Sequence, residues 1–214
     1  VPNVSVELPE GKKVAILGRP NAGKSTFINQ IINEDRLIVS DIAGTTIDAI
    51  SVPFEFNNHK FIFIDTAGIR KGYKYNHKIE YFSYVRAIHA IEQSDIVIFI
   101  CDATDGLVDQ DLKILNMIID NGKPVLFVFN KIDLLKKEEL IEIYKTKKMQ
   151  SEFMSNLVTL EISAIKKLGF NKVFNMTNKL IDLSQKKFST SNLNNLLRKF
   201  ISMSAPPAVG GRQL

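Results

Sequence analysis

The segment KVAILGRPNAGKSTFINQII, which begins at Lys13, is the feature that most constrains the fold of this chain. An apolar run ends at Gly18, and the residues from Lys24 onward place Phe27 and Ile31 at helical spacing. Between the two halves, GRPNAGKS fits the pattern G-x-x-x-x-G-K-[ST] in full. We therefore predict a strand, a glycine loop and a helix, with loop N–H groups that surround a phosphate chain.

The remaining sequence alternates between strand and helix patterns. SVPFEF and KFIFID flank NNH, which predicts a β-hairpin, and Pro53 predicts that the first of these strands lies at a sheet edge. DIVIFICDAT and KPVLFVFNKID are continuous apolar runs typical of parallel strands covered on both faces. We predict an α/β doubly wound sheet, mostly parallel with one antiparallel edge strand and with helices on both faces.

Further elements are predicted toward the end of the chain. The pattern predicts a helix in DQDLKILNMIIDNG that stops at Gly122, a strand in NLVTLEISA and a helix in FNKVFNMTNKLIDLS. NLNNLLRKFIS is a candidate for one more helix. Ligands of such sheets bind at the carboxyl ends of the strands. The polar motifs that fall there begin at Gly18, Asp65, Asn130 and Ser163.

Composition narrows the class of protein. With 214 residues, 45% of them hydrophobic, the chain can bury a sizeable core. The single cysteine, Cys101, excludes an intramolecular disulfide and is predicted to be a reduced core thiol. His59, His77 and His89 lack metal-ligand spacing. A reduced single cysteine leads us to expect a cytoplasmic protein. No apolar run is long enough to span a membrane, and no signal peptide is visible. The net charge of +5 comes with scattered lysine pairs typical of solvated helix faces.

The motif predicts a chemical role for two residues of the phosphate loop. Lys24 places a positive charge near the β- and γ-phosphates, and the hydroxyl of Ser25 is available to Mg²⁺. The residues predicted to bind the phosphates are Gly18, Arg19, Pro20, Asn21, Ala22, Gly23, Lys24, Ser25 and Thr26.

The motif NKID, Asn130 to Asp133, indicates which base is bound. The Asp133 carboxylate accepts two hydrogen bonds, and guanine presents two adjacent donors where adenine presents none. We therefore predict GTP or GDP as the ligand, with Asn130 and Lys131 beside the base. Ser163 and Ala164 would brace the base through backbone groups.

Two further motifs concern the metal ion and the γ-phosphate. In DTAG the Asp65 carboxylate would hold the Mg²⁺ shell, and the N–H of Gly68 would sense the γ-phosphate. Thr66 and Ala67 complete this nucleotide-binding motif. In GTT, Thr45 or Thr46 would coordinate Mg²⁺ when the γ-phosphate is present, so we expect 38–50 to be a switch segment.

These five motifs occur in order, and together the chain resembles the TrmE–Era class of GTPases, which have the P-loop NTPase fold. DIAGTTIDAI and DTAGIRKGYKYNHKIEYFSYVRAIHAIEQSDIVIFICDATDGLVDQD resemble most closely the second G domain of the Der (EngA) family of tandem GTPases. The resemblance implies GTP hydrolysis with Mg²⁺ in assembly of the large ribosomal subunit, and it covers nearly the whole chain.

The tail TSNLNNLLRKFISMSAPPAVGGRQL resembles the start of the KH-like domain that follows this G domain in Der. The resemblance therefore divides the chain into a lead-in (1–12), a G domain (13–187) and the partial start of a KH-like domain (188–214). Contacts with the ribosomal subunit or its rRNA would use domains mostly missing here, and we expect this piece to be monomeric.

The residues implicated in hydrolysis depart from the commonest GTPase pattern. Many GTPases carry a water-orienting glutamine after DTAG, but this chain has Ile69 there. Arg19 and Arg70 are candidate internal arginine fingers. In related TrmE–Era proteins the asparagine that matches Asn21 helps bind K⁺ beside the phosphates. The alternative is that Asn21 only hydrogen-bonds its own loop. The catalytic residues predicted here are Lys24, Gly68, Asn21 and Thr46.

Two other functions remain open from the sequence. One is the G domain of a TrmE-type tRNA-modification GTPase, although the tail does not end in that family's cysteine motif. The other is a nucleotide-dependent interaction module that turns over too slowly for hydrolysis to matter.

Overall fold

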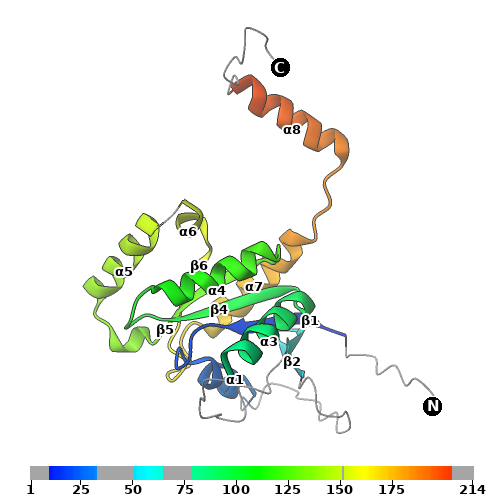
Figure 1. Ribbon diagram of the computed structural model, residues 1–214. Helices are drawn as coiled ribbons and strands as arrows, with labels where there is room; N and C mark the ends of the chain where they lie inside the picture. Colours follow the sequence, from blue (N-terminus) through cyan, green and yellow to red (C-terminus); the bar gives the residue numbers. More distant parts are fainter. Residues whose placement is uncertain (1–9, 33–50, 65–78, 151, 204–214) are drawn as a thin grey trace, which may run out of the picture. The chain divides into compact units, whose positions relative to one another are not determined.

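The computed structural model describes residues 10–32, 51–64, 79–150 and 152–203 (Figure 1). The chain divides into two compact units, Val1–Ile181 and Asp182–Leu214.

The first unit contains a sheet whose described strands follow the order β2-β3-β1-β4-β5-β6. Every neighbouring pair is parallel except β2 and β3. The strands are β1 (Lys12–Leu17), β2 (Val52–Phe56), β3 (His59–Ile64), β4 (Ile96–Asp102), β5 (Val125–Asn130) and β6 (Thr159–Glu161). The predicted mostly parallel sheet with one antiparallel edge strand is confirmed, although β1 begins at Lys12, one residue earlier than expected.

The hairpin differs in one detail from its prediction. The predicted loop had three residues, but His59 pairs with Phe56 and leaves only Asn57 and Asn58 in the turn. Both asparagines have positive φ, 49° and 62°, as a two-residue turn that matches the strand twist requires. Pro53 lies in β2 at the sheet edge, as its missing N–H predicts.

Helices cover both faces of this sheet. They are α1 (Lys24–Ile32), α3 (Ile79–Gln93), α4 (Asp109–Asp120), the 3₁₀ turn η1 (Ile132–Leu134), α5 (Lys137–Gln150), α6 (Glu152–Asn156) and α7 (Phe170–Ser184). Phe27 and Phe174, from α1 and α7, pack on one side with Val14 of β1. Leu115 of α4 packs on the other side with Ala15, the next residue of β1. Alternate residues of the central strand thus enter opposite cores, which explains its continuous apolar sequence.

The second unit contains α8 (Thr190–Met203), which confirms the predicted tail helix. Its apolar residues recur at helical spacing and are 50–61% exposed: Leu193, Leu196, Leu197, Phe200 and Ile201.

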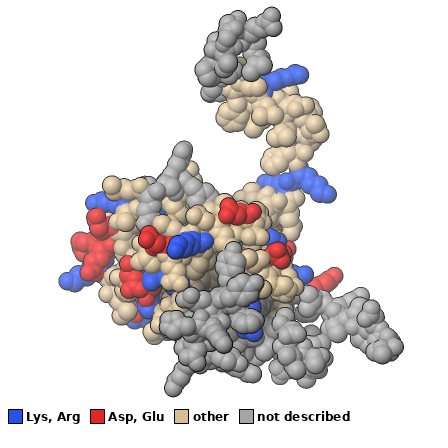
Figure 2. Space-filling view, viewed as in Figure 1, with Lys and Arg blue, Asp and Glu red and all other residues tan. Residues whose placement is uncertain are grey.

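Two surface properties follow from the described residues. On the face shown in Figure 2, Lys and Arg side chains are interspersed with Asp and Glu side chains rather than gathered in one basic field. Within the described ranges, no helix combines the length and apolar character needed to cross a bilayer.

Candidate nucleotide-binding site

The loop between β1 and α1 requires glycine at two positions. A Cβ on Gly18 would lie 2.1 Å from the carbonyl oxygen of Ile100 in β4, and the φ of Gly18 is +145°. A Cβ on Gly23, where φ is +96°, would lie 2.1 Å from the Asn130 side-chain nitrogen. The two glycines of the motif therefore allow the loop to pack against β4 and against the base-recognition motif.

Asn21 stands at the tip of this loop with a φ of +63°. Asparagine adopts this left-handed conformation more readily than most residues, so the backbone alone gives a reason for its presence. The residue is exposed. The side chain is thus accessible from outside the loop, whatever further role it has.

The ammonium group of Lys24 lies against the loop's own backbone. Its Nζ donates to the carbonyl oxygens of Gly18, at 2.8 Å, and Arg19, at 2.5 Å. Burial lowers the pKa of Lys24 to about 8, and the charge of Asp111 partly opposes this shift. The loop therefore holds a partly desolvated cation that a phosphate chain would stabilise.

Asn130, at the end of β5, joins three of the predicted motifs. Its Nδ2 donates to the carbonyl of Ala22 at 2.8 Å, and its Oδ1 accepts from the N–H of Ala164 at 2.9 Å. The residue is 1% exposed. Asn130 therefore acts as a brace between the phosphate loop and the loop that carries Ser163 and Ala164, here called the SA loop.

Residues predicted to recognise the base line a pocket beside Asn130. Its lining consists of Gly23, Thr26, Asn130, Lys131, Asp133, Leu134, Ala164 and Ile165. Asp133 is half-buried in this lining. Ser163 is fully buried, and its backbone exchanges two hydrogen bonds with Leu168, at 3.1 and 3.2 Å, that close the SA loop. The predicted base and phosphate residues thus meet at the carboxyl edge of the sheet.

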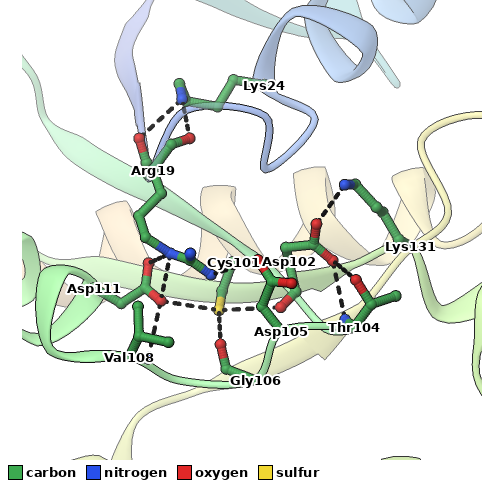
Figure 3. Close-up of polar contacts among 11 residues, drawn as sticks. Arg19, Lys24, Cys101, Asp102, Thr104, Asp105, Gly106, Val108, Asp111 and Lys131 are labelled. Carbon is green, nitrogen blue, oxygen red and sulfur yellow. Dashed lines mark hydrogen bonds and ion pairs between the residues drawn. The ribbon is translucent and has the colours of Figure 1, made fainter.

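Arg19 is fixed by acidic side chains of the segment that follows β4 (Figure 3). Its Nε donates to both oxygens of Asp111, at 3.0 and 2.9 Å, and its Nη2 pairs with Asp105 at 3.2 Å. Burial tends to lower the pKa of Arg19, but Asp111 and Asp105 outweigh it and raise that pKa. The guanidinium of Arg19, one of the two candidate arginine fingers, is thus engaged by carboxylates in this structure.

Asp102, at the end of β4, holds Lys131 in a similar way (Figure 3). Its Oδ2 pairs with Lys131 Nζ, and its Oδ1 accepts from the N–H and hydroxyl of Thr104, at 3.0 and 2.7 Å. Burial opposes ionisation of Asp102, but the bonds from Lys131 and Thr104 prevail and lower its pKa. Lys131 itself has a φ of +66°.

Cys101 is a buried free thiol, as predicted. Its Sγ lies 3.5 Å from the Gly106 carbonyl and 3.7 Å from an Asp111 oxygen. Burial and the neighbouring Asp111 raise its pKa far above the usual range. The thiol is therefore unreactive at neutral pH. His59 and His89 are exposed, which agrees with the surface role predicted for them.

Several predicted residues lie outside the described ranges. They are Thr45, Thr46, Asp65, Thr66, Ala67, Gly68, Ile69, Arg70 and His77, together with the switch segment 38–50. Among the residues with described positions, no cluster of His, Cys, Asp or Glu could hold a metal ion. Ser25 is exposed at the start of α1, where its hydroxyl is accessible to Mg²⁺.

The sequence prediction missed the roles of Asp102, Asp111 and the Arg19 side chain. A signal for Asp111 was present, because it stands four and seven residues before Leu115 and Ile118, on the buried face of α4. A carboxylate on an apolar face needs a partner, and a cationic one is favoured. Nothing in the sequence alone identified Arg19 as that partner.

Comparison with known proteins agrees with this geometry. Residues 13–131, more than half of the chain, match the family described as 50S ribosome-binding GTPase. GTPase Der of Hamiltonella defensa is 39% identical over 202 residues, which cover 94% of this chain and 41% of the relative. GTPase Der of Mycoplasma capricolum is 39% identical over 212 residues, 98% of this chain and 49% of that relative. The chain thus spans about half the length of the curated relatives it matches.

A solved structure supports the same assignment. Era in complex with MgGDPNP and a segment of 16S ribosomal RNA matches with a TM-score of 0.61 and 29% identity, covering 79% of this chain and 56% of that one. These similarities confirm the resemblance to Der and to the Era-like P-loop fold. The phosphate loop, the guanine-type motif and the sheet order form one GTPase domain, and the chain belongs to the 50S ribosome-binding GTPase family.

Proposed function

We propose that this chain binds GTP and hydrolyses it to GDP and phosphate, as a switch in assembly of the large ribosomal subunit. The observation that carries the proposal is Asn130, which ties Ala22 of the phosphate loop to Ala164 beside the base pocket. One nucleotide can then contact both motifs at once. The family match and the Der relatives support the ribosomal role.

Each end of the nucleotide has a defined partner in this proposal. Guanine enters the pocket beside Asp133, whose carboxylate accepts from N1–H and the 2-amino group. The phosphates approach the loop, and Lys24 exchanges its two backbone acceptors for phosphate oxygens. Discrimination against adenine arises because adenine would leave the Asp133 carboxylate without these donors.

The Mg²⁺ ion that such GTPases use would be held by Ser25 together with Asp65 and Thr45 or Thr46. When bound, it neutralises charge that develops on the β- and γ-phosphates. Lys24 supplies a second positive charge from the protein. Gly68 is the proposed sensor of the γ-phosphate.

We also propose that Asn21 contributes a ligand to a K⁺ ion beside the phosphates. Asn21 is exposed at the loop tip, where its backbone is left-handed. With the Arg19 side chain engaged by Asp111, a monovalent cation would supply the charge that an arginine finger supplies elsewhere. Ions of this kind act on the transition state more than on binding.

The test is GTP turnover by the purified chain, measured with and without large ribosomal subunits. Turnover that increases on adding the large subunit supports the ribosomal role. A GTP turnover rate that does not change when the large subunit is added, but increases with tRNA-modification partners, would favour the TrmE-type alternative. Nucleotide binding with no turnover in either condition would favour the interaction module.

A further inference from the structure

We propose that Asp111 is a positioning residue for the phosphate loop, which it holds through Arg19. This inference rests on the proposed function, because it concerns the same nucleotide site. Asp111 lies in the first turn of α4, whereas the loop follows β1, so the contact joins segments 92 residues apart in sequence (Figure 3).

The carboxylate of Asp111 is rigidly held. It is 0% exposed, and both of its oxygens accept from the Arg19 Nε. Its Oδ2 also accepts from the N–H of Val108 at 3.3 Å, in a capping arrangement at the start of α4. A buried carboxylate with a charged partner is costly to separate, so the pair fixes the Arg19 side chain relative to α4.

Arg19 passes this restraint to Lys24 through its main chain. The same residue whose side chain meets Asp111 offers its carbonyl oxygen to Lys24 Nζ, at 2.5 Å, and to the N–H of Ala22, at 3.4 Å. One residue, Arg19, therefore connects Asp111, through its side chain, with the Lys24 ammonium group, through its carbonyl oxygen. This ammonium group is the one that would meet the phosphates.

The loop needs such external anchors because it is irregular. Gly18, Asn21 and Gly23 all have positive φ, so neither a helix nor a strand ladder holds this backbone in place. Asn130 anchors the loop from β5 through the Ala22 carbonyl, and Asp111 anchors it from α4. The two anchors act on neighbouring parts of the loop from different elements.

Asp105 provides a matched control. It pairs with the same guanidinium at 3.2 Å, but its side chain is 55% exposed. An exposed pair contributes little to holding a geometry. Asp111 is buried and accepts the Arg19 Nε–H with both oxygens, so it should hold Arg19 more firmly than the exposed Asp105 does.

The experiment compares Asp111→Asn with Asp105→Asn in the full chain. GDP release is followed with a fluorescent GDP analogue, and single-turnover GTP hydrolysis is expressed per bound nucleotide. Asp111→Asn is expected to speed GDP release about tenfold and to slow hydrolysis ~10- to 100-fold, because a small misplacement of a phosphate-binding group has effects of this size. Asp105→Asn should change either rate less than about twofold.

A double-mutant cycle tests whether Asp111 acts through Arg19. In an Arg19→Met background, Asp111→Asn should have little further effect on either rate, because Arg19→Met already removes the contact between the two side chains. Arg19→Lys, which keeps one charged contact, should retain more activity than Arg19→Met. If Asp111→Asn does not fold, the difference between Arg19→Lys and Arg19→Met decides the question.

Two results would overturn the proposal. The first is a lower melting temperature for Asp111→Asn with unchanged GDP release and unchanged hydrolysis per bound nucleotide. The second is full additivity of the two substitutions. Absence of GTP hydrolysis in the unmutated chain would instead refute the proposed function, while the GDP release rates would still decide the role of Asp111. Failure to bind GDP would overturn both.

Discussion

The side-chain amide of Asn130 donates to the carbonyl oxygen of Ala22 at 2.8 Å, across 108 residues of sequence. The same side chain accepts from the N–H of Ala164 at 2.9 Å. One buried residue thus sets the separation between the phosphate loop and the base pocket. This separation has to match the distance between the base and the phosphates of one nucleotide.

Replacing Asn130 with Ala should weaken both folding and nucleotide binding. The change removes two buried hydrogen bonds and leaves their partners unsatisfied, at a cost of about 2–4 kcal/mol in total. Thermal unfolding and a GDP titration measure the two effects. Asn175→Ala is a suitable control, because Asn175 is an exposed position of α7. Unchanged GDP affinity in Asn130→Ala would contradict the bracing role.

The Asn21 prediction concerns the choice of monovalent cation. If Asn21 is a K⁺ ligand, GTP hydrolysis at constant ionic strength should be faster in K⁺ than in Na⁺. Asn21→Gly removes the amide but tolerates the φ of +63° without strain, whereas Asn21→Ala would strain the loop. Asn21→Gly should therefore lose the cation preference and slow K⁺-supported hydrolysis about a hundred- to a thousandfold. Its GDP affinity should be nearly unchanged.

Equal rates in K⁺ and Na⁺ for the unmutated chain would leave Asn21 with its backbone role alone. In the proposed mechanism the predicted switch segment would complete such a site, so the comparison is best repeated with large ribosomal subunits present.

Nucleotide binding should depend on pH through Lys24. In the free chain burial lowers the pKa of this ammonium to about 8, while phosphates favour the charged form and raise it in the complex. Binding therefore takes up a proton between these two pKa values, and GDP affinity falls as the pH rises above about 8. Below that range Lys24 is charged in both states, and it adds no pH dependence.

Calorimetric GDP titrations in buffers of different ionisation enthalpy measure this proton uptake. Lys24→Arg is the control, since a guanidinium does not titrate in this range. Uptake that is the same in the unmutated chain and in Lys24→Arg would show that another group is responsible.

Much of this architecture could be predicted from local patterns. The apolar runs of β4 and β5 and the glycine loop after β1 are strong signals, because burial on both faces and positive φ admit few residue types. By contrast, α5 was not predicted, since its sequence KEELIEIYKTKKMQ is mostly polar and its amphipathic pattern is weak. Helix α3 was also not predicted, although Val85, Ile88 and Ile91 stand at helical spacing in its sequence.

The candidate site also contains residues that the sequence identifies and residues that it does not. Residues that act through their own chemistry, such as Lys24 and Asp133, can be identified from motifs. Residues that act by holding others, such as Asp102 and Asp111, depend on contacts between distant segments, which one sequence does not reveal. Asn130 belongs to both groups, because its motif predicted a base contact while the structure shows a brace.

Removing the tail after Ser189 should leave nucleotide binding intact. The described site residues all lie in the first unit, and the deletion removes only part of the second unit. GDP affinity should stay within about twofold of the full chain, and solubility should improve because five exposed apolar residues of α8 are lost. Truncation after Gly169, which removes the buried Val173 and Phe174, should instead unfold the domain. Loss of GDP binding on truncation after Ser189 would show that the tail supports the site.

The central claim, that this chain hydrolyses GTP and selects guanine through Asp133, is tested most directly by phosphate release. The unmutated chain and Asp133→Asn are each supplied with GTP or xanthosine triphosphate, in the presence of Mg²⁺ and K⁺. We expect the unmutated chain to release phosphate from GTP. In Asp133→Asn, GTP binding should weaken by ~2–4 kcal/mol, and the preference should shift toward xanthosine triphosphate, whose 2-oxo group accepts from the new amide. No phosphate release from GTP by the unmutated chain, or unchanged GTP affinity in Asp133→Asn, would contradict the account.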